Sequence, residues 1–240
     1  MKVSLSCSLQ SFSDKRQAVI CDLRRSSKEG PVIEVVMLRF AHQDSYKSFK
    51  NQHRTGDSVQ VFGLLRQMQS FVVDPASRKP VKRSDGSEIL EAGLAVEVRE
   101  HRPIPRPEDT DHFWAFGIVG VVDKRDGLRV SAAGTSYLRM RVAYNHYKRA
   151  NETEGQADFY DLIAFGGQAE SLLNLEKGDR FLVDYALPAS HTYAMRDLTF
   201  ADGTPIKKSG LELRVREFTF LPRSRTESRT RRSDPLPLAL

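Results

Sequence analysis

The sequence predicts an all-β protein with short helices, built as two tandem halves of one design. Apolar and polar residues alternate in many short stretches, as is typical of strands with one buried face. A segment at 102–112 holds three prolines and no apolar period, which predicts an extended linker between the halves. Each half has five such stretches with a short helical piece between the third and the fourth. This order is that of the OB fold, a five-stranded Greek-key barrel.

The first half, residues 1–101, is expected to form one barrel. A helical piece is predicted near 44–51, followed by a turn at Thr55-Gly56-Asp57. The strands are predicted at 3–12, 17–24, 32–40, 59–68 and 94–99. A basic loop precedes the last of them.

The second half, residues 113–222, is expected to form the other barrel. A helix is predicted at 168–174, followed by a turn at Lys177-Gly178-Asp179. The strands are predicted at 116–122, 138–144, 159–165, 181–186 and 211–220, with a long polar loop before the last. The remaining residues, 223–240, are rich in Ser, Thr and Arg and lack an apolar period, which predicts a disordered basic tail.

The strand at 159–165 has two unlike faces, because side chains alternate along a strand. One face carries Tyr160, Leu162 and Ala164. The other carries Phe159, Asp161, Ile163 and Phe165. The carboxylate marks the second face as the wetter one, so two phenylalanines are held toward solvent. Exposed rings on an OB barrel are suited to stacking on nucleic-acid bases, whereas the alternative is that both rings belong to the core.

Length and composition are those of a folded protein with two small domains or one large one. No apolar run approaches the ~20 residues of a membrane span, and the first residues lack the apolar stretch of a secretory signal. We therefore expect a cytoplasmic protein with no membrane partner. Cys7 and Cys21 are the only cysteines, and the six histidines form no metal-ligand spacing with them. Neither a disulfide nor a metal or other cofactor is indicated.

The net charge of +6 is compatible with a polyanionic partner. The excess of basic residues is concentrated in a few places, although a solvated surface explains any single one. In the first half they are Arg78, Lys79, Lys82 and Arg83. In the second half they are Arg139, Arg141, Lys148, Arg149, Lys207 and Lys208. In the tail they are Arg223, Arg225, Arg229, Arg231 and Arg232.

The most specific pattern runs from Asp158 to Val183: a strand opened by an aromatic residue and closed by Phe165-Gly166, a short helix, a Lys-Gly-Asp turn and another strand. In this order the segment resembles the bacterial single-stranded DNA-binding protein family, and the resemblance spans about 113–220. It implies sequence-independent binding and protection of single-stranded DNA in replication, recombination or repair, near the nucleoid and without catalysis. Because family particles hold four OB domains, it also implies a homodimer of this chain, with replication or repair proteins as further partners.

The resemblance also implies a set of binding residues. It places base-stacking aromatics at Phe159, Phe165 and Tyr193, and Tyr147 is added to them. Leu138, Met140 and Val142 would be core, which turns Arg139 and Arg141 outward. Phosphates would be contacted by these two arginines, Lys148, Arg149, Lys207, Lys208 and the basic loop. Asp161 departs from the family pattern and is expected to weaken phosphate attraction locally.

The first half fits the resemblance less well. It keeps Phe40 and Phe71 at corresponding places, but Glu34 stands where the leading stacking residue would be. We therefore expect the first barrel to be the weaker binder, or mainly a scaffold. In the tail, the family's acidic tip is missing, and the arginines there are expected to add sequence-independent contacts to nucleic acid.

The sequence also bears on other functions. Asp158 and Asp161 point to opposite faces of a regular strand, which argues against a metal-dependent nuclease. Gly117-Ile118-Val119-Gly120 lacks the Gly-Lys-Ser/Thr of a phosphate-binding loop. Two alternatives stay open: an RNA-binding OB protein, and a protein-interaction module of a replication or secretion assembly in which the exposed aromatics form an interface.

Overall fold

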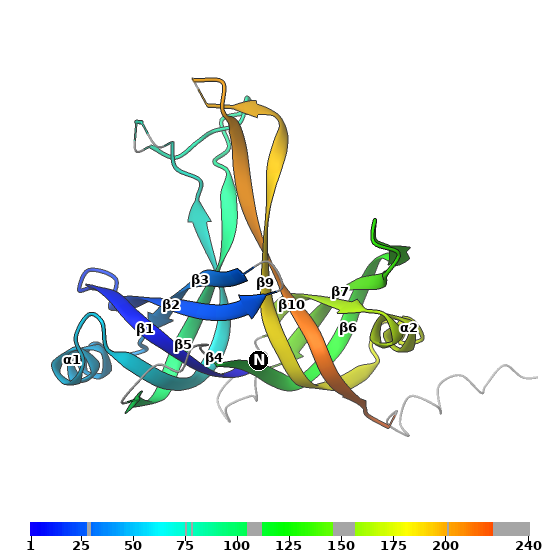
Figure 1. The fold of residues 1–240 in the computed structure, drawn as a ribbon, viewed down its shortest axis with the longest axis horizontal. Helices are drawn as coiled ribbons and strands as arrows, with labels where there is room; N and C mark the ends of the chain where they lie inside the picture. Colours follow the sequence, from blue (N-terminus) through cyan, green and yellow to red (C-terminus); the bar gives the residue numbers. More distant parts are fainter. Residues whose placement is uncertain are drawn as a thin grey trace, which may run out of the picture.

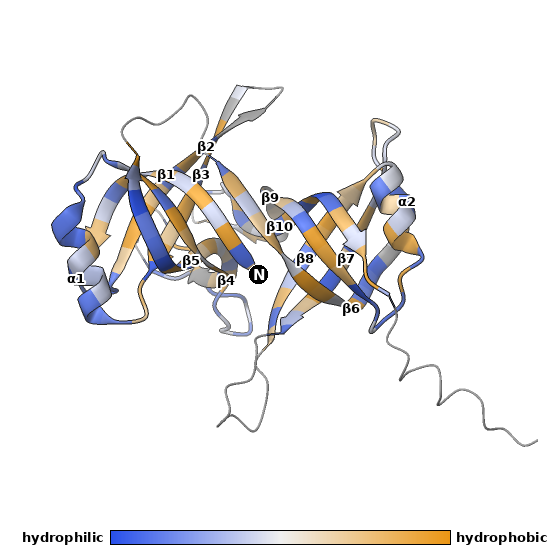
Figure 2. Ribbon diagram, turned by 90° about the horizontal axis from the view of Figure 1, so that it is seen from below, coloured by the Kyte–Doolittle hydropathy of each residue, from blue (hydrophilic) through white to orange (hydrophobic). Residues whose placement is uncertain are grey.

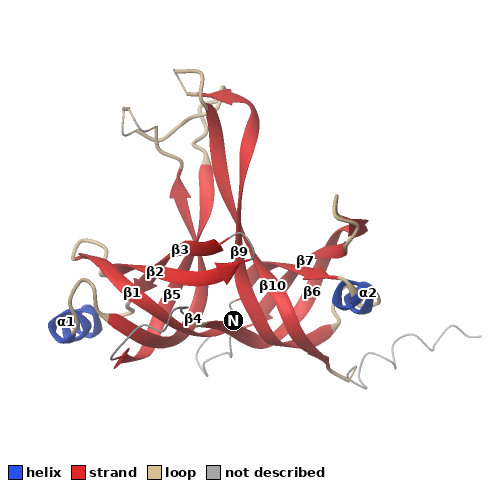
Figure 3. Cartoon of the chain, viewed as in Figure 1, coloured by secondary structure: helices blue, strands red, loops and turns tan. Residues whose placement is uncertain are grey.

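The computed structural model describes residues 1–27, 30–74, 76–77, 79–104, 112–145, 157–200 and 202–222. Two barrels lie side by side, with α1 at one outer end and α2 at the other (Figure 1). Strands make up most of the described chain, and the two helices are short (Figure 3). Neither of these helices has the length and apolar character needed to cross a membrane.

The first barrel is a closed ring of five strands with one helix. Its elements are β1 (Lys2–Ser13), β2 (Ala18–Ser27), β3 (Gly30–Arg39), α1 (Gln43–Gln52), β4 (Ser58–Phe71) and β5 (Leu90–Ile104). The strands pair in the order β1, β2, β3, β5, β4 and back to β1, and the β3–β5 pair is parallel. Tyr46 and Phe49 of α1 are buried against the barrel.

The second barrel repeats this arrangement. Its elements are β6 (Phe113–Val130), β7 (Ser136–Asn145), β8 (Ala157–Phe165), α2 (Gly167–Leu173), β9 (Arg180–Thr199) and β10 (Pro205–Phe220). The strands pair in the order β6, β7, β8, β10, β9 and back to β6, and the β8–β10 pair is parallel. The predicted fold class, two tandem five-stranded OB barrels, is therefore confirmed.

Several strands are longer than the sequence predicts. β5 continues to Ile104, so the first three residues of the expected linker are paired with β4. The expected polar loop before 211 is instead a paired hairpin, in which Tyr193 lies opposite Lys208. Apolar residues of this arm such as Met195 and Ile206 pack against the β4–β5 arm, but they are too sparse in the sequence to give the alternation that reveals a strand.

The β4–β5 and β9–β10 hairpins project together from the barrels, at the top of Figure 1. A small apolar cluster joins them, separate from the main core. Its buried members are Val72, Ile89 and Ile206, with Val81, Met195, Leu198 and Phe200 packed against them. The two arms thus support each other away from the barrels.

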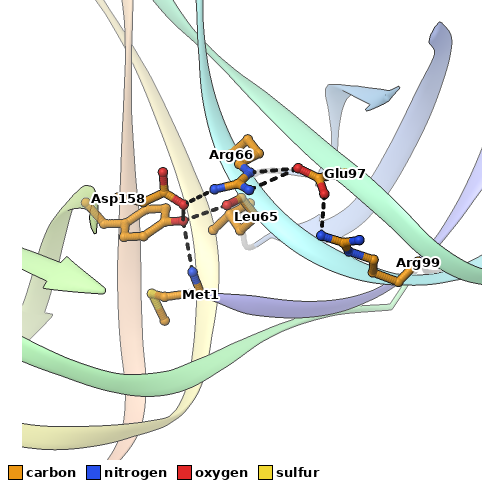
Figure 4. Close-up of polar contacts among 7 residues, drawn as sticks. Met1, Leu65, Arg66, Glu97, Arg99 and Asp158 are labelled. Atoms are coloured by element: carbon orange, nitrogen blue, oxygen red, sulfur yellow. Dashed lines mark hydrogen bonds and ion pairs between the residues drawn. The ribbon is translucent and has the colours of Figure 1, made fainter. Parts of the chain in front are cut away.

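The barrels are joined through β1 and β6, which pair antiparallel from Lys2 opposite Phe116 to Leu5 opposite Phe113. Polar contacts next to this seam also cross between barrels (Figure 4). Arg66 of β4 forms ion pairs with Glu97 at 3.0 Å and with Asp158 of β8. Because strands and ion pairs bridge the two halves, their relative placement is fixed by the fold.

Candidate nucleic-acid interface

The two faces of β8 differ as the alternation predicts. Tyr160, Leu162 and Ala164 are buried in the barrel core. On the opposite face Phe159 is 44% exposed, while Asp161 and Phe165 are half-buried. Ile163 on that face is buried, because it lies between Arg139 of β7 and Arg214 of β10. The prediction of faces is confirmed, and Phe159 is the more accessible of the two rings on this face of β8.

The adjacent strand β7 continues this surface. Leu138, Met140 and Val142 are buried in the core, as predicted. Arg141 therefore lies on the outer face, with its guanidinium 5.6 Å from the centroid of the Phe159 ring. A stacked cation adds to the positive potential near this ring.

Two residues of this surface were missed by sequence analysis. Tyr137 lies opposite Phe165, with ring centroids 6.1 Å apart. The Arg214 guanidinium lies 4.5 Å from the centroid of the Phe165 ring. The alternation of Leu213, Arg214 and Val215 places Arg214 outward, but its contact with β8 depends on the parallel β8–β10 pairing, which no local pattern reveals.

Carboxylates form ion pairs with Arg139 and Arg141, the two predicted arginines of β7. Arg139 forms an ion pair with Glu212 at 2.8 Å. Asp161 lies 3.7 Å from Arg141 and 3.3 Å from Arg125. Positive charge on this part of the surface is therefore partly balanced before any anion binds.

The other predicted residues are dispersed. Tyr193, Lys207 and Lys208 belong to the β9–β10 arm, where Lys207 is exposed; the Tyr193 side chain is not described. Lys79, Lys82 and Arg83 are exposed in the loop of the β4–β5 arm, with Phe71 exposed where that loop begins. Four predicted residues, Arg78, Tyr147, Lys148 and Arg149, lie outside the described residues, as does the tail at 223–240.

The prediction for Phe40 is wrong. This residue is only 9% exposed, and its ring packs between the barrel and α1, 5.0 Å from the Phe49 centroid and 5.7 Å from that of Tyr46. A ring buried in this way has no free face for a base.

The reason is a shift of one residue between the halves. In the parallel pairs, Val36 lies opposite Leu94 in the first barrel, and Leu162 lies opposite Leu213 in the second. Taking these pairs as equivalent, Ile33 corresponds to Phe159 and Arg39 corresponds to Phe165. Matching the halves by their aromatic residues shifts β3 by one position, which exchanges its two faces.

Glu34 is affected by the same shift. It corresponds to Tyr160 in the buried row and is itself buried, so it does not replace a stacking residue. The outward positions of β3 are held by Ile33 and Val35, which are 56% and 60% exposed. The first barrel therefore carries aliphatic side chains where the second carries Phe159 and Asp161.

Clustered metal ligands are not found in the described part of the chain, where no three His, Cys, Asp or Glu side chains lie close enough to hold an ion. Cys7 and Cys21 are buried thiols that are not joined in a disulfide.

Comparison with known proteins agrees with this architecture. Residues 114–219 match the model of the single-strand binding protein family. The single-stranded DNA-binding protein of Thermus aquaticus has a similar structure at 18% sequence identity, with a TM-score of 0.56 over 93% of each chain. A deletion and substitution variant of that protein gives 16% identity and a TM-score of 0.54, over 93% of this chain and 95% of the other.

At these identities the solved structures establish the shared fold, and a comparison with curated protein sequences finds no match. The family match falls on the barrel that carries Phe159, Phe165 and Arg214. This second barrel, residues 114–219, belongs to the single-strand binding protein family.

Proposed function

We propose that the protein binds single-stranded DNA with little sequence preference, mainly through its second barrel. The observation that carries this proposal is the outer face of β7 and β8, where the exposed Phe159 ring lies under the Arg141 guanidinium. Every base offers a flat face to an aromatic ring, so stacking holds a strand regardless of its sequence. No catalytic step is part of this function.

Phe165 and Tyr137 extend the stacking surface along the barrel. Arg214 lies over Phe165 and brings positive charge to the place where a backbone would pass. Lys207 on the β9–β10 arm, with Lys79, Lys82 and Arg83 on the β4–β5 arm, adds exposed positive charge beside the barrels. The family membership of the second barrel and the function named for the Thermus aquaticus protein support the same conclusion.

Titration with oligo-dT at several salt concentrations tests the proposal. Affinity should fall as salt rises, with a log–log slope of about −0.7 for each phosphate contact on a single strand. Duplex DNA should compete poorly, because its stacked bases are not available to the rings. Equal competition by duplex would overturn the stacking mechanism, and stronger competition by matched RNA would reassign the substrate.

We also propose that the chain acts as a homodimer. The observation that supports a homodimer is an apolar patch on the outer face of the sheet formed by β4, β1, β6 and β9. The patch consists of Phe62, Trp114, Phe116, Ile118 and Leu182. The pairings of Ser4 with Phe62 and Trp114, and of Ile118 with Leu182, put these side chains on one face.

Figure 2 views the molecule from below and shows β6 running beside the β1–β4 side of the first barrel. Four of the patch residues are large apolar side chains that are at least 36% exposed. Contiguous apolar surface of this kind marks a protein interface more often than free surface. Two chains joined here would bring four barrels together for DNA replication, recombination or repair.

A further inference from the structure

A groove lies at the junction of the two barrels, with a volume of about 660 Å³. One wall comes from β3 and β5 of the first barrel and the other from β9 and β10 of the second. β3 also lies near β9 and β10 in Figures 1 and 2. The groove is thus formed only because the barrels are fixed side by side.

The second-barrel wall carries two arginines, Arg214 and Arg216. Neither forms an ion pair with a carboxylate among the described residues, in contrast to Arg139 and Arg141. Burial and the neighbouring Arg216 lower the pKa of Arg214. Two guanidiniums without a counter-charge at the rim of a groove are suited to binding an anionic group.

The first-barrel wall is aliphatic. Ile33 and Val35 point outward from β3 and are more than half exposed, and Met37 lies further along the same face. These positions correspond to those of the nucleic-acid face on the second barrel. Bases that pack on such side chains remove apolar surface from contact with water, although aliphatic groups lack the ring faces of Phe159 and Phe165.

Arg214 connects the groove with the stacking face, because it lines the groove and also lies over the Phe165 ring. We infer that single-stranded DNA leaves the second barrel at Phe165 and continues into this groove, with Arg214 and Arg216 contacting phosphates and bases packing on Ile33 and Val35. This inference rests on the proposed function. Glu34 and Glu91 also line the groove from the first barrel, so the phosphates follow the β10 side.

An apolar protein segment is the other occupant that such a wall would accept. DNA is favoured because the groove is continuous with the stacking face, and because its β10 side carries Arg214 and Arg216, which form no ion pair with a carboxylate among the described residues. The first barrel then takes part in binding through Ile33 and Val35, at positions that alignment by aromatic residues does not identify.

The test compares a short and a long oligo-dT. The short one has about 10 nucleotides, inside the range that one OB fold covers, and the long one has about twice that length. Arg216→Ala should weaken binding of the long oligo by roughly tenfold, as expected for loss of a hydrogen bond to a charged group. It should also reduce the log–log salt slope by about 0.7 and leave the short oligo unaffected.

The long oligo should bind the parent protein more tightly than the short one does. Ile33→Asp should abolish this difference in affinity, because it places a carboxylate on the first-barrel wall of the groove. Arg180→Ala and Val130→Asp are the matched controls, since they make the same charge changes at exposed positions outside the groove. If the Ile33→Asp variant fails to fold, the Arg216→Ala variant alone tests the strand path, because the Arg216 side chain is exposed.

The outcomes separate the two proposals. If Phe159→Ala weakens both oligos and the groove variants weaken neither, the strand path is wrong and the proposed function stands. If Phe159→Ala changes nothing, the proposed function itself fails. If the groove variants bind DNA normally but lose a protein partner in a defined pull-down, the groove is a protein-docking site.

Discussion

The Tyr160 hydroxyl on β8 donates a hydrogen bond to the carbonyl oxygen of Leu65 on β4, at 2.6 Å, and so links one barrel to the other. The same hydroxyl accepts a hydrogen bond from the amino group of Met1 at 2.9 Å (Figure 4). Burial and the nearby Asp158 carboxylate raise the pKa of Tyr160, which keeps its proton available for the Leu65 carbonyl. One buried side chain therefore satisfies a carbonyl group of β4 and the amino group at the start of the chain.

Tyr160→Phe should lower the free energy of unfolding by about 1–3 kcal/mol, because it leaves buried polar partners unsatisfied. Urea denaturation followed by circular dichroism measures this. Tyr185→Phe is the control, since no hydrogen bond of the Tyr185 hydroxyl is found among the described residues; its effect should stay within about 0.5 kcal/mol. Equal stability of the Tyr160 variant and the parent would mean that the hydroxyl does not contribute to joining the barrels.

Phe159 and Phe40 should respond to alanine in opposite ways. Phe159→Ala should weaken oligo-dT binding by about 1–3 kcal/mol with little change in stability, because its ring is exposed. Phe40→Ala should lower the free energy of unfolding by about 3–5 kcal/mol, as a core cavity does. Binding and unfolding are measured on the same preparations. A binding loss for Phe40→Ala with unchanged stability would contradict its place in the core.

The second barrel was more predictable from sequence than the first for a physical reason. In β8, Asp161 marks the solvent-facing side of the strand, so a single residue shows which side chains point outward. In β3 the only carboxylate, Glu34, is buried, and the exposed face carries Ile33 and Val35. The usual sign of an outward face is therefore reversed in β3, and matching the two halves by their aromatic residues places this strand one residue out of register.

Long-range contacts account for what sequence analysis left out of the candidate site. Arg214 reaches Phe165 only through the parallel β8–β10 pair, and Glu212 reaches Arg139 across the same sheet. The groove requires β3 of one barrel beside β10 of the other. Local periodicity contains no information on such neighbours.

Asp161→Asn should strengthen oligo-dT binding. The Asp161 carboxylate neutralises Arg125 and Arg141 beside the Phe159 ring and repels phosphates. Removing its charge should steepen the log–log salt slope by about 0.7 if one more phosphate contact forms. Glu176→Gln is the control for net charge, since Glu176 is exposed in the turn after α2. If both variants gain affinity equally, the effect is one of net charge and the local pairing has no role.

The His53–His101 pair should make the stability of the first barrel depend on pH. The ring nitrogens lie 3.1 Å apart, and both rings pack against Phe49. Burial lowers the pKa of His53, although Asp57 opposes this; burial and His53 lower the pKa of His101. The unfolded chain then binds more protons below the ordinary value of 6.5, so stability should fall as pH drops through that value.

Urea denaturation between pH 8 and pH 5 measures this dependence, with His101→Gln as the comparison. The amide side chain hydrogen-bonds but does not titrate, so the variant should lose less stability on acidification than the parent. Parallel curves for the two proteins would assign the pH dependence to other groups.

The proposed homodimer makes the last prediction, which concerns the apolar patch of Phe62, Trp114, Phe116, Ile118 and Leu182. Sedimentation velocity at micromolar concentration should give twice the mass of the chain. Trp114→Asp combined with Phe116→Asp should give single chains, because two carboxylates would be buried without partners in the interface.

The matched control is Val73→Asp, at a residue that is 45% exposed like Trp114 but lies in the β4–β5 arm. This variant should remain dimeric, and circular dichroism confirms that each variant is folded. A parent protein that sediments as a single chain would remove the dimer and leave the patch as a surface for a different protein. A double variant that stays dimeric would place the interface elsewhere, because a contact centred on Trp114 and Phe116 does not tolerate two buried charges.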